Sequence, residues 1–431
     1  MKKFELNPDD KNNIRYTLEN DCLNRKKYII NLTKYLNAID ENYIISLDGK
    51  WGSGKTFFVK QLQYILENDC STFFKESENK FIEELREKYI PVYYNAWAND
   101  DHDNVIESLI FNILNQFPQF KNKLNLKNQD FRKIIEDIMK NIIEKGSRGF
   151  LSKDILDDIK DIDSFAKNVI TYEEKKECLD NIFNDLIKEN GRLLLIIDEL
   201  DRCKPDYAVK ILETIKHFYN NNKITIIVST DNKQLSNCVR KFYGYDFDGY
   251  GYLNKMYDAV ISINLEKRNK YLEIYCDFYD EEDFVSYVNF FLIDYYDLGL
   301  RECNRFVSMY NLCYKYIIQE DCFDKMKWMF YSKYFLVIGI VLKITNIDEY
   351  KKYMTGRDDD FVEQITKRIM EKNISYKEKL SKQLNVESNK IIEKILEMYH
   401  EIFNKEKNVY VYPINEALTF IGNRIQIEEN N

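Results

Sequence analysis

A short glycine-rich segment constrains the fold of this chain more than any other feature. It lies between an apolar run at residues 43–48 and a stretch at 57–67 in which apolar side chains recur with helical spacing. Strand, loop and helix in this order place backbone N–H groups of the loop at a helix N-terminus, where they can surround an anion. The segment matches the pattern G-x-x-x-x-G-K-[ST] over Gly49, Lys50, Trp51, Gly52, Ser53, Gly54, Lys55 and Thr56.

This pattern predicts a separate role for each residue type. The glycines let successive N–H groups turn inward toward a β-phosphate. Lys55 is expected to pair with the β- and γ-phosphates, and Thr56 is expected to give its hydroxyl to Mg²⁺. Trp51 is expected to pack against a lid or a partner rather than to touch phosphate. The predicted nucleotide-binding residues here are Gly49, Trp51, Gly52, Ser53, Gly54, Lys55 and Thr56.

A second apolar run carries the acids that such a loop needs. Five aliphatic residues at 193–197 lead directly into Asp198 and Glu199, as in a Walker B strand. Asp198 is expected to hold Mg²⁺ through water, next to Thr56. Glu199 is the first candidate for the group that orients or deprotonates an attacking water, and Asp201 is the alternative.

Further polar residues complete the predicted site. Ser229 and Thr230 end a fourth apolar run and are candidate sensors of the γ-phosphate, or ordinary turn residues. A guanine-specific site would have Asn-Lys-x-Asp where this chain has a leucine at 235, so ATP is favoured. Arginines that can stabilise transition-state charge, or form ordinary salt bridges, are Arg202, Arg240, Arg301 and Arg305, the last two on one face of a predicted helix.

Composition excludes several other classes of protein. A net charge of -9 and a pI near 5.3 argue against a general nucleic-acid coat, although they leave room for a local basic groove. Nine cysteines without a C-x-x-C pair, and three histidines, suggest neither a zinc site nor a disulfide framework. The N-terminus lacks the apolar core of a signal peptide, and the run at 334–342 is about half the ~20 residues that a membrane span needs. We therefore expect a cytoplasmic protein without a membrane span.

The apolar runs also predict the order of the elements. Continuous runs at 43–48, 90–94, 193–197, 224–228 and 259–263 suit parallel strands that are covered on both faces. A charged helical insertion is expected at about 100–190, with a turn at 146–149, and helices beyond 265 include 299–319 and 324–344, with a loop at 356–360. We predict an α/β core over 1–265 and an all-helical region over 266–431.

Several motifs together resemble one family. Residues 51–56 resemble W-G-S-G-K-T, and residues 198–203 resemble D-D-L-D-R-C with a glutamate as the second acid. Further similar segments are N-A-W at 95–97, Y-G followed by Y-L-x-K at 243–255, R-x-x-x-R at 301–305 and a turn at 23–25 that lies near the adenine in the family. The chain thus resembles the KAP family of P-loop NTPases, a branch of the STAND-type, additional-strand ATPases, over about residues 20–310.

This resemblance implies a three-layer α/β NTPase with a helical lid that acts on ATP with Mg²⁺. Many members carry transmembrane helices between the two Walker motifs, whereas this chain has charged sequence there, so membrane anchoring is not expected. Bacterial members are associated with phage exclusion, which suggests defence as the setting. Residues 311–431 have no counterpart in the resemblance.

Three hypotheses follow for function. The first is an ATP-hydrolysing switch that acts through a protein partner or a homo-oligomer formed by the helical regions. The second is a nucleotide-gated scaffold with little hydrolysis. The third is a nucleic-acid-binding module that uses Lys367, Arg368 and Lys379, and the net acidity makes it the least favoured.

Overall fold

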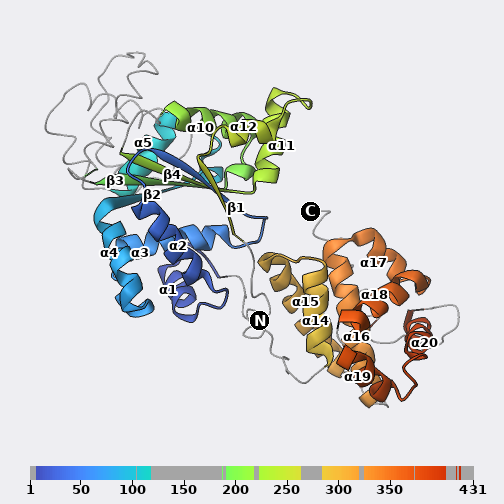
Figure 1. The fold of residues 1–431 in the computed structure, drawn as a ribbon. Helices are drawn as coiled ribbons and strands as arrows, with labels where there is room; N and C mark the ends of the chain where they lie inside the picture. The colour runs from blue at the N-terminus through green and yellow to red at the C-terminus, as the bar shows by residue number, and fades with distance from the viewer. Residues whose placement is uncertain are drawn as a thin grey trace, which may run out of the picture. The chain divides into compact units, whose positions relative to one another are not determined.

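The protein is described by a computed structural model (Figure 1). It describes residues 6–102, 104–117, 187, 191–217, 223–263, 284–319, 325–372, 374–403, 414, 417 and 418. The chain divides into two compact units, residues 7–264 and residues 265–431, and each is described by itself. Most of the predicted helical insertion at about 100–190, including the predicted turn at 146–149, lies outside the described residues.

The first unit is built on a five-stranded parallel sheet. Its strands are β1 (Tyr43–Asp48), β2 (Tyr89–Asn95), β3 (Arg192–Asp198), β4 (Ile224–Thr230) and β5 (Ala259–Ser262), in the order β2-β3-β4-β1-β5. All five predicted strands are present, with ends that differ by no more than two residues. Strand β4 separates β1, which leads into the glycine-rich loop, from β3, which ends in the predicted acids.

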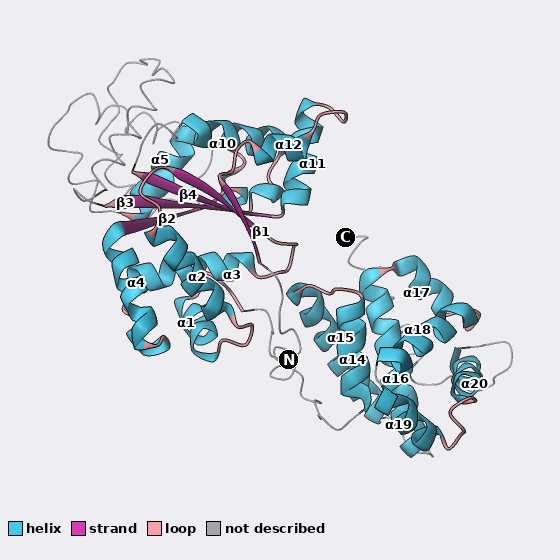
Figure 2. Cartoon of the chain, in the orientation of Figure 1, coloured by secondary structure: helices cyan, strands magenta, loops and turns pink. Residues whose placement is uncertain are grey.

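Helices cover both faces of this sheet, which gives three layers (Figure 2). One face carries α1 (Lys11–Asn20), α2 (Arg25–Asn37), α3 (Lys55–Glu67) and α4 (Glu76–Lys88), and the other carries α5 (Val105–Gln116), α10 (Pro205–His217), α11 (Asn232–Tyr243) and α12 (Gly249–Asn254). Alternate residues of a strand enter different cores: Ile45 joins the core with α3, whereas Ile44 joins the core with α10. The three-layer α/β fold is therefore confirmed.

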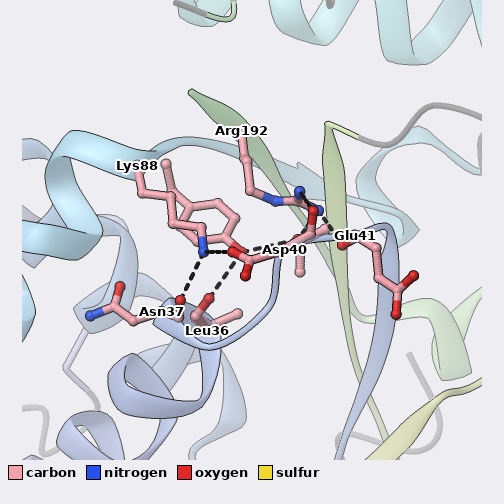
Figure 3. A network of polar contacts seen from close by, with 8 residues as sticks. Leu36, Asn37, Asp40, Glu41, Lys88 and Arg192 are labelled. Carbon is pink, nitrogen blue, oxygen red and sulfur yellow. Dashed lines mark hydrogen bonds and ion pairs between the residues drawn. The ribbon is translucent and has the colours of Figure 1, made fainter. Parts of the chain in front are cut away.

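A polar network holds the entry to β1, at the end of the sheet away from the glycine-rich loop (Figure 3). Arg192, which is buried, donates hydrogen bonds to the carbonyls of Asp40, at 2.8 Å, and of Glu41. Lys88 donates to the carbonyl of Asn37 at 2.8 Å and pairs with the Asp40 carboxylate at 3.0 Å. The connection from α2 is thereby tied to the first residue of β3 and the last residue of α4.

The second unit is helical in its described residues. Its helices are α14 (Phe284–Tyr295), α15 (Leu300–Gln319), α16 (Lys325–Thr345), α17 (Ile347–Tyr353), α18 (Asp359–Lys372), α19 (Ile374–Leu384) and α20 (Ile391–Phe403). Buried tyrosines bond to backbone carbonyls in its core: the Tyr353 hydroxyl donates to Phe335 at 2.9 Å, and the Tyr399 hydroxyl donates to Tyr353 at 2.6 Å. Paired hydroxyls of this kind let large aromatic side chains be buried without unsatisfied polar atoms.

Two predictions about this unit have clear outcomes. The helices expected at 299–319 and 324–344 are confirmed as α15 and α16. The loop expected at 356–360 is partly wrong, because Asp359 and Asp360 form the first turn of α18, where acidic side chains favour the helix dipole. Among the described helices, none is long and apolar enough to span a membrane.

Candidate nucleotide-binding site

The glycine-rich loop has a conformation that its glycines permit. Gly52 and Gly54 have φ angles of 78° and 82°, in the left-handed region that costs glycine little. A Cβ atom on Gly49 would lie 2.8 Å from Ser53 Oγ, too close for an ordinary contact. The Gly49 N–H donates to the carbonyl of Thr230 at 3.2 Å, so the loop is also tied to the end of β4.

Lys55 lies buried within this loop at the start of α3. Its ammonium group donates to the carbonyl of Gly49 and, at 3.3 Å, to that of Lys50. Burial lowers the pKa of Lys55, and the nearby carboxylates of Asp201 and Asp231 partly oppose that effect. The structure thus places a buried cation, surrounded by acids, at the position where the sequence predicts phosphate binding.

Asp198 lies at the same edge of the sheet, separated from the loop by one strand. It is 1% exposed and pairs in register with Ser229 of β4. One carboxylate oxygen accepts a hydrogen bond from the Tyr93 hydroxyl at 3.1 Å, and the other accepts the Glu199 N–H at 3.0 Å. A buried carboxylate that two donors orient in this way is a suitable ligand for a hydrated divalent cation.

Glu199 follows in a strained backbone conformation, with φ at 61°. Both of its carboxylate oxygens are engaged: Oε1 pairs with Arg202 at 2.9 Å, and Oε2 accepts a hydrogen bond from Asn95 at 3.3 Å. Burial raises the pKa of Glu199, whereas the charge of Arg202 lowers it. The Arg202 guanidinium in turn lies 5.3 Å from the centre of the Trp97 ring. Side chains from β2 and the turn after β3 therefore hold this carboxylate in place.

Asp201, the alternative base, has different surroundings. Its carboxylate is buried and accepts a hydrogen bond from the indole N–H of Trp51. Burial raises its pKa, and Lys55 has the largest opposing effect. Asp201 is thus joined to the glycine-rich loop, whereas Glu199 is held by Asn95 and Arg202.

Three buried hydroxyl groups on the loop and on β4 have no partner within the part of the chain that the structure describes. They belong to Ser53, Ser229 and Thr230. Buried polar atoms nearly always form hydrogen bonds, so these oxygens fit a site that a polar ligand or water completes. Asp231, the next residue, is already used, because it caps α11 by accepting the N–H groups of Lys233 and Gln234 at 3.1 and 3.2 Å.

Arg25 also contacts the loop, and the motif spacing did not reveal this. Arg25 is 6% exposed, and its guanidinium donates from Nη2 to the Ser53 carbonyl at 2.5 Å. Its other terminal nitrogen, Nη1, is buried without a partner among the described residues. Burial lowers the pKa of Arg25 to about 10. The only sequence signal was the weak likeness of residues 23–25 to a turn near adenine.

The remaining candidate arginines lie on α11 and α15. Arg240 of α11 donates to the Tyr245 carbonyl at 3.1 and 2.7 Å. Arg301 and Arg305 are exposed on α15, in the second unit, as the four-residue spacing predicts for a shared face. Arg202 pairs with Glu199, one of the predicted site acids.

Comparison with known proteins identifies the family. A family model described as the KAP family P-loop domain matches residues 25–316. This chain belongs to the KAP family. The match extends past the first unit of this KAP protein into α15 and includes both Arg301 and Arg305. Among solved structures, the Aeropyrum pernix ORC2 protein in ADPNP-ADP complexes is similar at 12% identity with a TM-score of 0.37, over 92% of this chain and 93% of that chain. No curated protein matches the sequence.

Proposed function

We propose that this KAP protein binds ATP with Mg²⁺ and hydrolyses it to switch conformation. One observation carries the proposal: the loop with Lys55 and the buried acids after β3 lie at one edge of the sheet, with only β4 between them. A glycine loop alone binds an anion, but a loop beside two oriented carboxylates also suits a metal ion and an attacking water.

The loop residues are proposed to bind the triphosphate. Backbone N–H groups would contact phosphate oxygens, and Lys55 would exchange its loop carbonyls for phosphate. Trp51, whose indole N–H is bonded to Asp201, would respond to any movement of the loop. The proposed nucleotide-binding set is Gly49, Trp51, Gly52, Ser53, Gly54, Lys55 and Thr56, with Ser229 and Thr230 as sensors.

The site has suitable ligands for Mg²⁺. Thr56 is half-buried at the start of α3, and Asp198 is oriented by two donors, so these residues would hold the ion. When bound, Mg²⁺ would neutralise charge on the phosphate oxygens.

Glu199 is proposed to orient the water and accept its proton, and Asp201 remains the alternative. Asn95 and Arg202 hold the Glu199 carboxylate, and its raised pKa is suited to proton transfer. Arg301 and Arg305 are proposed to act on the nucleotide from the helical region at 266–431. That region would pass the state of the core to a partner or to a second copy of the chain, in the cytoplasm, with phage defence as the suggested setting.

One observation favours the nucleotide-gated scaffold as a second candidate. Both oxygens of Glu199 are engaged within the protein, so an attacking water must reach the one lone pair that each oxygen still has free. If it does not, the protein would hold ATP and hydrolyse it slowly.

The decisive experiment measures ATP hydrolysis, nucleotide binding and molecular mass on the same purified samples. Lys55→Ala is expected to lose binding, and Glu199→Gln is expected to keep binding but lose turnover. Glu83→Gln, an exposed acid on α4, is the matched control and should behave as the wild type. Unchanged hydrolysis in both site variants would refute the proposal, and tight binding without turnover in the wild type would establish the scaffold instead.

A further inference from the structure

A ladder of aromatic rings runs along α14 of the second unit. Tyr287, Phe291 and Tyr295 are spaced four residues apart, and their neighbouring ring centres lie 6.4 and 5.7 Å apart with nearly parallel planes. Tyr376 of α19 stacks on Tyr287 at 3.6 Å. We call these four residues the aromatic ladder.

Three exposed cations lie over this ladder. Each cation has its charged group within 6 Å of a ring centre, the distance at which cation–π attraction acts. The pairs are Arg368 over Tyr295 at 5.0 Å, Lys372 over Phe291 at 5.4 Å and Lys379 over Tyr376 at 5.8 Å. We call Arg368, Lys372 and Lys379 the cation row. Its members come from two helices, and the ladder aligns them.

The cation row has no acidic partners in the described part of the chain. Neighbouring Lys367 differs, because it pairs with Glu363 at 2.5 Å. Residues 367–382 contain six basic and two acidic residues, a local net charge of +4 in a chain of net charge -9. The two acids are Glu371, three residues after Arg368 on α18, and Glu378 on α19, and neither forms an ion pair with a member of the row among the described residues. Arg368 donates a hydrogen bond to the Tyr295 hydroxyl, but no member of the row forms an ion pair among the described residues. A surface of net positive charge therefore stands out from an acidic protein.

The spacing of the row indicates the kind of partner. Rings four residues apart on a helix are separated by about 6 Å along its axis, so Arg368 and Lys372 repeat at about that interval. Cations that lie among aromatic rings suit a nucleic acid, whose bases stack on such rings, better than an acidic peptide or a membrane surface. Tyr295, which is 42% exposed, adds an aromatic ring at the end of the row where a base can stack.

We propose that the cation row binds the phosphate backbone of single-stranded nucleic acid. This function is separate from ATP hydrolysis and does not depend on the nucleotide site. Each cation would contact one phosphate and release its counterions, while Tyr295 would contact a base.

The test uses the full-length protein and a fluorescent single-stranded DNA oligonucleotide, with binding measured by anisotropy over a range of salt concentrations. Three phosphate contacts predict a slope of about -2 for log affinity against log salt, so tenfold more salt weakens binding about 100-fold. A duplex of the same length, phosphatidylserine vesicles and polyglutamate are measured in parallel, and each is expected to bind more weakly than the single strand.

The variant Arg368→Gln, Lys372→Gln, Lys379→Gln is expected to lose this binding. Its control is Lys351→Gln, Lys352→Gln, Lys390→Gln, which removes three charges from exposed lysines of the same unit. Circular dichroism establishes that both are folded. If the triple variant does not fold, Lys379→Gln alone is measured, and its salt slope should fall by about 0.7.

Three results would overturn the proposal. The first is an affinity for the oligonucleotide that salt does not change. The second is an equal loss of binding in the control variant. The third is tighter binding of the duplex, the vesicles or polyglutamate than of the single strand.

Discussion

Replacing Arg25 by methionine is expected to weaken nucleotide binding while nearly preserving the free energy of unfolding. The guanidinium is buried, and its pKa falls from an ordinary 12.5 to about 10, which corresponds to a cost of about 3 kcal/mol for burying the charge. Methionine removes that cost but also removes the hydrogen bond to the Ser53 carbonyl, which is worth about 1.5–3 kcal/mol for a charged donor. The two changes oppose each other, so stability should stay within about 2 kcal/mol of the wild type.

The effect of Arg25→Met on nucleotide affinity is not offset by a second, opposing effect. Without Arg25, the peptide after Ser53 must be ordered when phosphate binds, and ordering the backbone of one residue costs about 1–2 kcal/mol. Affinity for ATP and for ADP should therefore fall about five- to thirtyfold. The loss should be similar for both nucleotides, because the loop is expected to contact phosphates that they share.

The assay compares titration with a fluorescent nucleotide against urea denaturation for the wild type and Arg25→Met. Lys27→Met, an exposed lysine on the same helix, is the control and should change neither quantity. The reasoning is refuted if Arg25→Met binds nucleotide as tightly as the wild type does. It is also refuted if the loss of affinity is no larger than the fraction of unfolded Arg25→Met protein accounts for.

Three other changes test separate parts of the structure. Arg192→Met should affect stability rather than nucleotide affinity, the opposite of Arg25→Met. Two backbone carbonyls lose their donor, so urea denaturation should show a loss of about 2–4 kcal/mol in the free energy of unfolding, and the folded protein should bind nucleotide with unchanged affinity. Tyr93→Phe removes a donor to Asp198, so a Mg²⁺ titration of ATP binding should shift to higher concentration and stability should fall by about 1–3 kcal/mol. Glu199→Gln should be more stable than the wild type at neutral pH, because a raised pKa means that the charged form costs stability there. Denaturation at a series of pH values should show this gap closing as the pH falls through the raised pKa of Glu199 toward the ordinary value of 4.5, with no further change below it. A gap that stays constant over that range would contradict the assignment.

Local sequence was enough to predict most of the core. Each strand is a continuous apolar run, and such runs have few alternatives to burial between two helical layers. The glycines of the loop were also predictable, because Gly52 and Gly54 adopt φ angles that other residues avoid. Where the prediction was wrong, at Asp359 and Asp360, the cause was local too: acids suit both a loop and the first turn of a helix.

The sequence by itself thus determined the strands, the loop between β1 and α3, and the presence of acids directly after β3. Only the tertiary structure decided which side chains surround them. The Arg25 contact spans 28 residues, that of Asn95 with Glu199 spans 104, and that of Trp51 with Asp201 spans 150. Periodicity and motif spacing describe neighbours along the chain, whereas these contacts depend on how the strands are ordered and how the helices pack across them. For the same reason, the cation row could not be predicted from the sequence, because it depends on how α14, α18 and α19 pack together.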